Sequence, residues 1–352
     1  MHVSRTTHRT LPPLPITPRT QGSVVTLGNF DGVHLGHQAL IQGLRRIAKP
    51  LGLSTHVVTF TPHPRDYFAA QGRGSPVLGI GNVRDRLERL AALGVDHVHL
   101  LRFNHALATL SPHDFVARVL VAGCHAKQVV VGHDVRFGHQ RTGDLALLKA
   151  LGERYGFTVS LQSDVLHGVA RTQAQPQAHS QSHPQSQPQA QRVSSSAVRA
   201  ALQAGDLATA RALLGYDLSH TSRVIHGRKL GRTLNCPTLN LIPRLANPAF
   251  RGIAVVAVDG LNENGTLSSR RYGVASLGLR PTVEQTTRFS LEVHVFDWSG
   301  DAYGQRLRVT YLHKLRDEAA YVDLATLQAA IAQDMRAARA WLGSHGYPVA
   351  LA

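Results

Sequence analysis

The sequence predicts an α/β region followed by a β region, and three observations support this. The chain has 352 residues, enough for about two domains at ~150 residues each. Between residues 24 and 161, short apolar runs alternate with helical patterns, as is typical of a parallel, doubly wound sheet. From Ser222 onward the apolar period is two, as in half-buried antiparallel strands. We therefore expect an N-terminal doubly wound parallel sheet and a C-terminal small antiparallel β-barrel with a terminal helix.

The elements of the first half follow from its apolar runs. We expect strands at residues 24–27, 55–60, 95–101, 128–131 and 157–161. The helices between them carry apolar residues three or four apart, and we expect them near residues 40–51, 83–93, 111–119 and 144–155.

In the second half, short alternating runs predict strands at residues 224–226, 252–258, 273–277, 291–298 and 306–312. A final helix is predicted from six apolar residues that share one face: Leu324, Leu327, Ala330, Ile331, Met335 and Trp341.

Composition limits the partners and the compartment. No apolar run approaches the ~20 residues that span a bilayer, so we expect no membrane partner. The formal net charge is +16, but the basic residues are scattered, which favours an enzyme that handles polyanions such as ATP over a nucleic-acid-binding protein. Only Cys124 and Cys236 occur, which indicates a reducing cytoplasm. The sequence does not determine the oligomeric state, and we take a monomer as the expectation.

Two segments differ in kind from the rest. Residues 1–22 are basic and contain several prolines, which indicates an N-terminal arm. Residues 172–191 consist almost entirely of Gln, Ala, Ser, Pro and His, which indicates a disordered insertion. We expect an α/β domain at 23–215 that contains this insertion, a linker at 216–222, and a barrel domain at 223–345.

The chain is organised around residues 24–37, VVTLGNFDGVHLGH. A buried strand is predicted to end in a glycine-containing turn, and a helix follows. Such a turn makes an anion site, because free backbone N–H groups and the helix dipole point to one place. His34 and His37 would project from one face of the first helical turn and donate to phosphate oxygens.

The spacing of the two histidines narrows the chemistry. The HxGH pattern resembles the signature of the nucleotidyltransferase superfamily, whose histidines bind the phosphates of a nucleoside triphosphate. No GK[ST] sequence follows, which excludes a Walker loop, and no Glu lies between the histidines, which excludes a zincin. Further along, the serines of the run VSSSAVR would cap a helix, and beside a nucleotide site they and Arg199 would also bind phosphate.

The second half carries its own candidates. The basic, glycine-rich loop at residues 227–232 is either a flap over phosphates or an ordinary turn. Thr238 and Asn240 lie two apart on an extended segment and offer oxygen ligands that suit Mg²⁺. Glu292 is predicted on the strand face opposite Leu291 and Val293, as either a general base or an exposed strand charge.

Together these motifs resemble one family, the bacterial bifunctional riboflavin kinase/FAD synthetase. The first half resembles its FMN adenylyltransferase module in GNFDGVHLGH, FTPHP, VVGHDVRFGHQRTGD and SSSAVR. The second half resembles its riboflavin kinase module in GRKLGRTLNCPTLN, GVASLGLRPTV, LEVHVFDWSGDAYGQRL and LHKLRDE. The resemblance extends from about residue 24 to residue 341.

The resemblance implies two reactions that use riboflavin, FMN and ATP with Mg²⁺. The barrel would phosphorylate the 5′-hydroxyl of riboflavin, with Glu292 as base and Thr238 and Asn240 at the metal. The first domain would then transfer AMP from ATP to FMN, yielding FAD, while His34 and His37 stabilise the developing charge.

Further roles are implied residue by residue. Nucleotide and phosphate contacts are expected from Gly28, Asn29, Phe30, Asp31, Ser194, Ser195, Ser196, Arg199, Gly227, Lys229 and Gly231. Flavin contacts are expected from His63, Asp134, Arg136 and Arg316.

Three features depart from the family pattern. Asn235, Cys236 and Leu239 replace family residues around the predicted metal ligands, Val135 replaces a usual Phe, and the insertion at 172–191 is additional. The HxGH turn alone would also allow an enzyme making CDP-alcohols or dephospho-coenzyme A, but the second-half motifs argue against it. A basic RNA-binding protein is the non-enzyme alternative.

Overall fold

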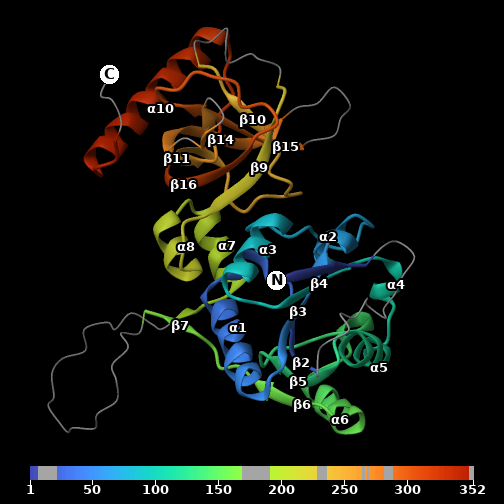
Figure 1. The fold of residues 1–352 in the computed structure, drawn as a ribbon. Helices are drawn as coiled ribbons and strands as arrows, with labels where there is room; N and C mark the ends of the chain where they lie inside the picture. The colour runs from blue at the N-terminus through green and yellow to red at the C-terminus, as the bar shows by residue number, and fades with distance from the viewer. Residues whose placement is uncertain are drawn as a thin grey trace, which may run out of the picture.

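Two regions lie one above the other in Figure 1, a sheet with surrounding helices and a barrel. The structure is a computed structural model, and it describes residues 1–6, 22–168, 191–227, 236–263, 266–267, 269–280 and 288–348. Helices α7 (Ser195–Gln203) and α8 (Leu207–Leu214) lie between the two regions. Both predicted architectures are confirmed.

The lower region is built on a six-stranded parallel sheet with the order β1-β4-β3-β2-β5-β6. Its strands are β1 (His2–Arg5), β2 (Ser23–Leu27), β3 (Ser54–Thr61), β4 (His97–Arg102), β5 (Ala126–Val131) and β6 (Thr158–Leu161). From β2 the chain builds outward through β3 to β4 on one side, and through β5 to β6 on the other. The strand order therefore reverses beside β2, the place where doubly wound sheets bind ligands at the carboxyl ends of their strands.

Helical segments connect these strands. They are η1 (Asp31–Val33), α1 (Leu35–Ala48), η2 (Lys49–Leu51), α2 (Pro64–Ala69), α3 (Val83–Ala92), α4 (His105–Ala108), α5 (Pro112–Phe115), the π-helix η3 (Val116–Gly123), η4 (His139–Arg141) and α6 (Leu145–Tyr155). Polar side chains cap the starts of several helices, as expected for serine and aspartate. Ser111, Asp144 and Ser194 each accept a backbone N–H at the start of α5, α6 and α7.

The upper region is a closed antiparallel barrel with the order β10-β15-β14-β11-β16-β9. Its strands are β9 (Ser219–Ile225), β10 (Leu239–Leu241), β11 (Gly252–Asp259), β14 (Arg271–Arg280), β15 (Arg288–Val295) and β16 (Arg306–Arg316). Two short hairpins are formed by β7 (Leu166–His167) with β8 (Gln191–Arg192), and by β12 (Asn262–Glu263) with β13 (Thr266–Leu267).

The terminal helix α10 (Leu324–Ser344) lies along the outside of the barrel, as Figure 1 shows. Ala338 and Leu342 are fully buried against Val255 and Phe296. The predicted apolar face is confirmed toward the end of the helix, where Met335 and Trp341 pack into this cluster. It is wrong at the start, because Leu324 is 59% exposed. A helix that packs only along its second half leaves its first turns in solvent.

The expected N-terminal arm needs correction. His2–Arg5 form β1, which pairs in parallel with β4 from His2 opposite His97 to Arg5 opposite Leu100. Four residues with one clearly apolar side chain give no strand pattern, and the backbone bonds to a distant strand decide the outcome. Residues 7–21 of the expected arm lie outside the described residues.

The structure also corrects the expected bounds of the linker and of the insertion. β9 begins at Ser219, so the last four residues of the expected linker at 216–222 belong to a barrel strand. The last residue of the expected insertion, Gln191, pairs with His167 in a short hairpin, while residues 169–190 lie outside the described part of the chain.

The apolar core of the barrel extends beyond its own strands. Val198, Leu202, Leu213 and Leu214 of helices α7 and α8 belong to the same buried cluster as the barrel interior. These two helices, which the sequence assigns to the first domain, therefore pack against both regions. Within the described ranges, no helix is both long and apolar enough to cross a membrane.

Candidate active sites

The first candidate site lies where β2 ends and the chain turns into α1. Phe30 has a φ of 50° and Gly32 a φ of 76°, so the turn depends on left-handed backbone conformations. A side chain at Gly32 would strain this backbone, and its Cβ would lie 2.8 Å from Ile80 Cγ2. The Gly28 N–H donates to Val58 O at 3.0 Å, which ties the turn to the end of β3. The predicted strand, turn and helix are thus confirmed.

Asp31 closes this turn. Its carboxylate accepts the backbone N–H groups of Ile80 and Gly81, and it forms a 2.7 Å ion pair with Arg199. Both partners are largely buried, with side chains 15% exposed for Arg199 and 10% for Asp31. Two residues predicted to bind phosphate therefore bind each other here, which brings the start of α7 against the turn.

His34 and His37 lie together, as predicted. Their rings stack with centroids 3.7 Å apart, and Phe30 packs on the other side of His37 with centroids 4.9 Å apart. The His37 backbone N–H donates to His34 Nδ1 at 3.4 Å, so His34 also caps α1. Because Nδ1 accepts, the proton of a neutral His34 lies on Nε2, where it is available to an anion.

Burial determines the protonation state of His34 and His37. Desolvation lowers the pKa of His34 to about 4, and it lowers the pKa of His37 well below 6.5 with a further contribution from His34 itself. Both rings are therefore neutral at pH 7. His37 Nδ1 is buried without a hydrogen-bond partner among the described residues.

Arg86 is a cation of this site that the sequence does not indicate. Its Nη1 donates to Asn29 O at 2.7 Å, Thr59 Oγ1 at 2.9 Å and Phe60 O at 3.1 Å. It comes from α3, where the helical pattern gives it the appearance of an ordinary polar-face arginine. The cation lies beside Asn29 and supports the ends of two neighbouring strands.

The serine run before α7 lies beside the same turn. Ser194 Oγ accepts the Ala197 N–H at 3.2 Å, which confirms the capping prediction. Ser195 Oγ donates to Asp31 O at 3.3 Å, and Arg199 Nε donates to Leu78 O at 2.8 Å. Ser196 follows in the first turn of α7.

The three predicted flavin contacts of the first region divide into two groups. His63 caps α2 by accepting the Arg65 N–H at 3.1 Å, and burial lowers its pKa to about 4 in the field of Asp31 and Arg199. It therefore lies near the turn. Asp134 and Arg136 follow β5 and are exposed, and Asp134 forms a 3.4 Å ion pair with Arg192.

The second candidate site is a row of polar residues across three barrel strands. Glu292 on β15 lies opposite Asn240 on β10 and opposite Ser276 on β14. Leu291 and Val293 are fully buried in the barrel, which confirms that Glu292 occupies the other face. Ser276 Oγ donates to Glu318 Oε1 at 3.2 Å, which places a second carboxylate beside the row.

The predicted metal ligands lie at the end of this row. Asn240 is 7% exposed, and its Oδ1 is buried without a hydrogen-bond partner among the described residues. Its Nδ2 donates to Thr238 O at 3.4 Å. Gly227 packs directly on the Asn240 side chain, leaving no room for a Cβ. An unpaired buried carbonyl oxygen fits a hard cation, because Mg²⁺ takes oxygen ligands.

Other predicted residues of the second half are placed differently. Arg316 forms a bidentate pair with Asp334 of α10, at 2.8 Å from Nε and 2.5 Å from Nη2, which raises the pKa of Arg316. Its guanidinium therefore ties the helix to the barrel. Lys229 and Gly231 lie outside the described residues.

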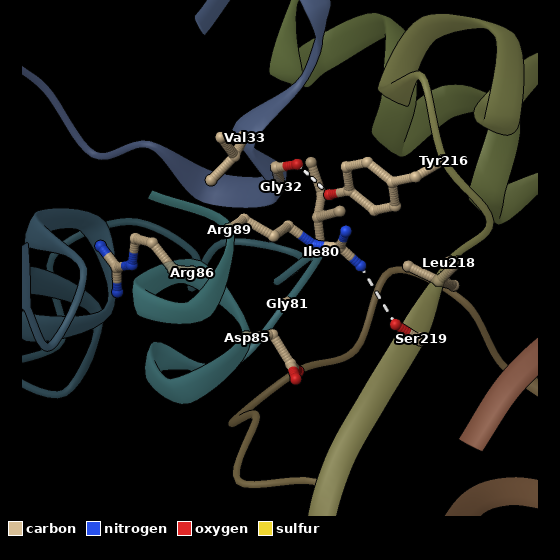
Figure 2. Close-up of a pocket in the computed structure, with 10 residues that line it drawn as sticks. All are labelled: Gly32, Val33, Ile80, Gly81, Asp85, Arg86, Arg89, Tyr216, Leu218 and Ser219. Atoms are coloured by element: carbon tan, nitrogen blue, oxygen red, sulfur yellow. Dashed lines mark hydrogen bonds between the residues drawn. The ribbon is translucent and has the colours of Figure 1, made fainter. Parts of the chain in front are cut away.

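The first site is joined to the barrel region around the pocket in Figure 2, which is lined by residues of both regions. Tyr216 OH donates to Gly32 O in the turn of the first site. Arg89 lies over the Tyr216 ring and donates to Ser219 Oγ of β9 at 3.1 Å. His220 of the same strand bonds to Ile80 O at 3.3 Å, next to the amides that Asp31 holds.

Comparison with known proteins gives matches over both regions. The family described as FAD synthetase matches residues 16–175, and the family described as riboflavin kinase matches residues 214–342. A "Bifunctional riboflavin kinase/FMN adenylyltransferase" of Escherichia coli (strain K12) is 36% identical, covering 92% of this chain and 94% of that protein. The protein of the same name from Pseudomonas fluorescens is 38% identical, with the same coverage of both chains.

A solved structure is also similar over nearly its full length. It is titled a macrolide-efflux protein from Streptococcus pneumoniae and has 27% sequence identity and a TM-score of 0.65. The alignment covers 92% of this chain and 96% of that chain. The two-region fold is therefore shared as a whole.

Proposed function

Because this chain belongs to the family of bifunctional riboflavin kinase/FMN adenylyltransferases, we propose that its two reactions take place at its two polar sites. The protein is a transferase that phosphorylates riboflavin to FMN and adenylylates FMN to FAD, with release of pyrophosphate. The assignment of each reaction to its site rests on which residues each family match covers. Residues 16–175 contain His34 and His37, and residues 214–342 contain Glu292.

Adenylyl transfer suits the turn around His34 and His37. The FMN phosphate is already an anionic nucleophile, so the site needs charge stabilisation more than a base. Neutral histidines that donate N–H groups to phosphate oxygens provide this, and burial keeps them neutral. Arg86 adds a fixed positive charge beside Asn29. The Asp31–Arg199 pair holds the α7 serines against the turn.

Riboflavin phosphorylation suits the polar row on the barrel. Glu292 projects from a paired strand, and a carboxylate in that position can accept the proton of the 5′-hydroxyl as the hydroxyl attacks the γ-phosphate of ATP. Asn240 and Thr238 offer the oxygens for Mg²⁺ at one end of the row. When bound, Mg²⁺ would neutralise charge on the ATP phosphates.

We also propose that the enzyme works in the reducing cytoplasm as a monomer, without nucleic acid or membrane partners. The two buried, unpaired cysteines and the scattered basic charge support this.

The assignment predicts that each site can be silenced alone. His37→Ala removes a donor aimed at developing charge, and losing one such donor costs about a hundred- to thousandfold in rate. FMN should then accumulate from riboflavin with little FAD. Glu292→Gln cannot accept the hydroxyl proton, and a positioned base contributes about a hundred- to ten-thousandfold. That variant should fail on riboflavin but convert supplied FMN to FAD.

The measurement is chromatography of flavins, starting from riboflavin and separately from FMN, each with ATP and Mg²⁺. Matched controls are His113→Ala and Glu153→Gln, which change exposed helical residues of the same types. A folded His37→Ala or Glu292→Gln protein that loses both reactions would contradict the two-site proposal. Normal phosphorylation by Glu292→Gln would make Glu292 an exposed strand charge only.

A further inference from the structure

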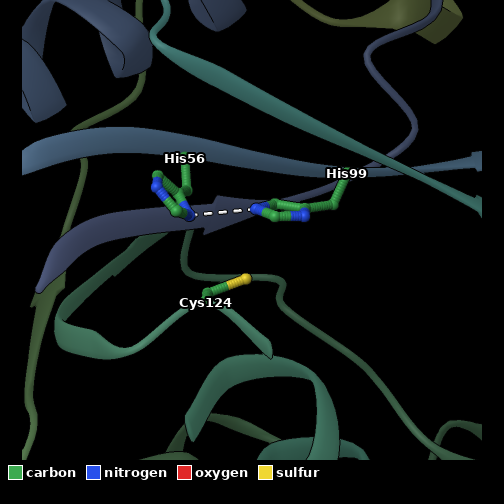
Figure 3. A group of neighbouring side chains, drawn as sticks. All are labelled: His56, His99 and Cys124. Atoms are coloured by element: carbon green, nitrogen blue, oxygen red, sulfur yellow. Dashed lines mark hydrogen bonds between the residues drawn. The ribbon is translucent and has the colours of Figure 1, made fainter. Parts of the chain in front are cut away.

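A second cluster of reactive side chains lies away from both active sites. It consists of His56 near the start of β3, His99 on β4, and Cys124 directly after η3. The three residues are 5%, 4% and 0% exposed. One nitrogen or sulfur atom from each lies within 4.8 Å of the other two, and Figure 3 shows the two rings meeting edge to edge near the thiol. The first active site lies at the opposite, carboxyl ends of these strands.

The hydrogen bonds of the cluster resemble the surroundings of a metal site. His56 Nδ1 and His99 Nε2 face each other at 2.9 Å. The outer nitrogens are held by serines, with Ser54 Oγ 2.9 Å from His56 Nε2 and Ser4 Oγ 2.8 Å from His99 Nδ1. Metal-bound histidines characteristically have their second nitrogen held in this way, which fixes the ring and its tautomer.

The cluster carries no charge in the absence of an ion. Burial lowers the pKa of His56 to about 2 and that of His99 to about 4, and it raises the pKa of the Cys124 thiol. Two neutral rings that face each other share one proton between their inner nitrogens. Without an ion, the inner nitrogens share one proton and the sulfur carries another. A bound cation would replace these protons and take the two nitrogens and the sulfur as ligands.

We propose that His56, His99 and Cys124 form a binding site for a thiophilic divalent ion, with Zn²⁺ as the ion that fits best. Zinc takes imidazole nitrogen at ~2.0–2.1 Å and thiolate sulfur at ~2.3 Å, usually in a tetrahedron. Two nitrogens of such a tetrahedron are about 3.3 Å apart, so the inner nitrogens, now 2.9 Å apart, need to separate by about 0.4 Å. The sulfur, now within 4.8 Å of the nitrogens, needs to lie about 3.6 Å from each of them. The described residues supply three ligands, and a water molecule completes the fourth position.

The proton balance of binding is simple. The proton between the inner nitrogens moves to the outer nitrogen of the ring that carried it, and both inner nitrogens then bind the ion. A serine hydroxyl can donate or accept, so the outer hydrogen bonds persist after it rotates. The thiol proton passes to solvent as the thiolate binds, so one proton is released for each ion. No electron is transferred.

The site would act on the stability of the sheet. It would join β3, β4 and the end of η3, and through Ser4 it would also hold β1, which pairs only with β4 at the sheet edge. The nucleotide-bound Mg²⁺ of catalysis would not compete, because Mg²⁺ prefers oxygen ligands.

The test uses the full-length protein and Co²⁺ as a spectroscopic probe for the zinc site. The chain has 21 histidines, so binding alone does not identify the site, whereas a thiolate-to-cobalt charge-transfer band does. We expect this band to saturate at one equivalent and to disappear when Zn²⁺ is added. Cys124→Ser should abolish the band, and the matched control Cys236→Ser should retain it. A band that survives in Cys124→Ser, or cobalt binding without any such band, would overturn the proposal.

A second measurement covers the case in which Cys124→Ser does not fold. X-ray absorption of the wild-type protein with one equivalent of Zn²⁺ should show one sulfur and at least two nitrogens around the metal, in Cys236→Ser as well. A metal shell without sulfur refutes the assignment. We also expect Zn²⁺ to raise the melting temperature of the wild-type protein and a chelator to reverse the change. An unchanged melting temperature would contradict the structural role.

Discussion

Arg86 supplies a fixed cation at the first site, and its surroundings explain why. It is partly buried, and one of its nitrogens contacts two backbone carbonyls and the Thr59 hydroxyl at the ends of β2 and β3. Desolvation lowers its pKa, but arginine remains charged at any physiological pH. Arg86 therefore both holds the ends of the two strands and supplies positive charge at the site.

Replacement of Arg86 by Met should impair adenylylation and spare the kinase. The change removes the charged donor that Asn29 O and Phe60 O share, although Asn29 O keeps its hydrogen bond from Thr59 Oγ1. Hydrogen bonds to charged groups contribute about 1.5–3 kcal/mol to the free energy of unfolding. It also removes positive charge beside the phosphate site. We expect FAD formation from FMN to fall at least tenfold, measured by chromatography, while FMN formation from riboflavin is retained.

The control for Arg86→Met is Arg84→Met on the same helix. Arg84 is about half exposed and forms a surface ion pair with Glu88, a type of contact worth about 0–1 kcal/mol. Equal losses in both variants would show that disturbance of α3, and not the cation beside Asn29, lowers the activity.

At the scale of elements, α10 is held to the barrel by apolar packing and by two ion pairs. Asp334 is 8% exposed and accepts two hydrogen bonds from Arg316, at the end of β16. A second pair, Arg339 with Asp297, also makes two hydrogen bonds and joins the same helix to the loop after β15. Its aspartate side chain is 46% exposed, whereas that of Asp334 is 10% exposed. The different burial of the two carboxylates predicts different contributions to stability.

Asp334→Ala should destabilise the barrel measurably. Hydrogen bonds to charged groups contribute about 1.5–3 kcal/mol, and the variant leaves the partly buried Arg316 without its carboxylate partner. Asp297→Asn, which changes the more exposed carboxylate of the second pair, should cost about 1 kcal/mol or less. Urea unfolding of both variants measures the difference. If the two changes cost the same, the Arg316–Asp334 pair does not hold the helix in place.

At the scale of the whole molecule, buried histidines make stability depend on pH. Burial lowers the pKa of His34, His63, His99 and His220 to about 4 each. Between about pH 4 and 6.5 these groups are neutral when folded and protonated when unfolded. The unfolded chain then binds more protons, so stability is lost as the pH falls through this window. Asp85 acts in the opposite direction, because burial raises its pKa to about 6.

His220 offers a test for one such group, since it is 1% exposed and bonds to Tyr311 and Ile80. Between pH 7 and pH 5 it should account for about 2 kcal/mol of lost stability. His220→Gln should lower stability at pH 7 but lose less on acidification than the wild-type chain. Urea unfolding at both pH values measures this, with His113→Gln as the exposed control. Identical losses in wild type and His220→Gln would contradict the assignment.

The sequence alone determined the features that depend on neighbouring residues. It predicted the strand, turn and helix around His34 and His37, the capping serine before α7, and the strand face that carries Glu292. Local periodicity and capping chemistry produce these features, so a short segment contains the information. The family motifs identified both reactions for the same reason, because each motif is a local pattern.

Only the tertiary structure decided the contacts between distant segments. Arg86 reaches the site from a different helix, and Asp31 pairs with a residue 168 positions away. Arg316, which the family resemblance assigns to the flavin, pairs with Asp334. His2–Arg5 form a sheet strand because β4 offers a free edge. Such pairings depend on the packing of whole elements. No local pattern distinguishes a paired, partly buried arginine from an exposed one, or a short edge strand from an irregular segment.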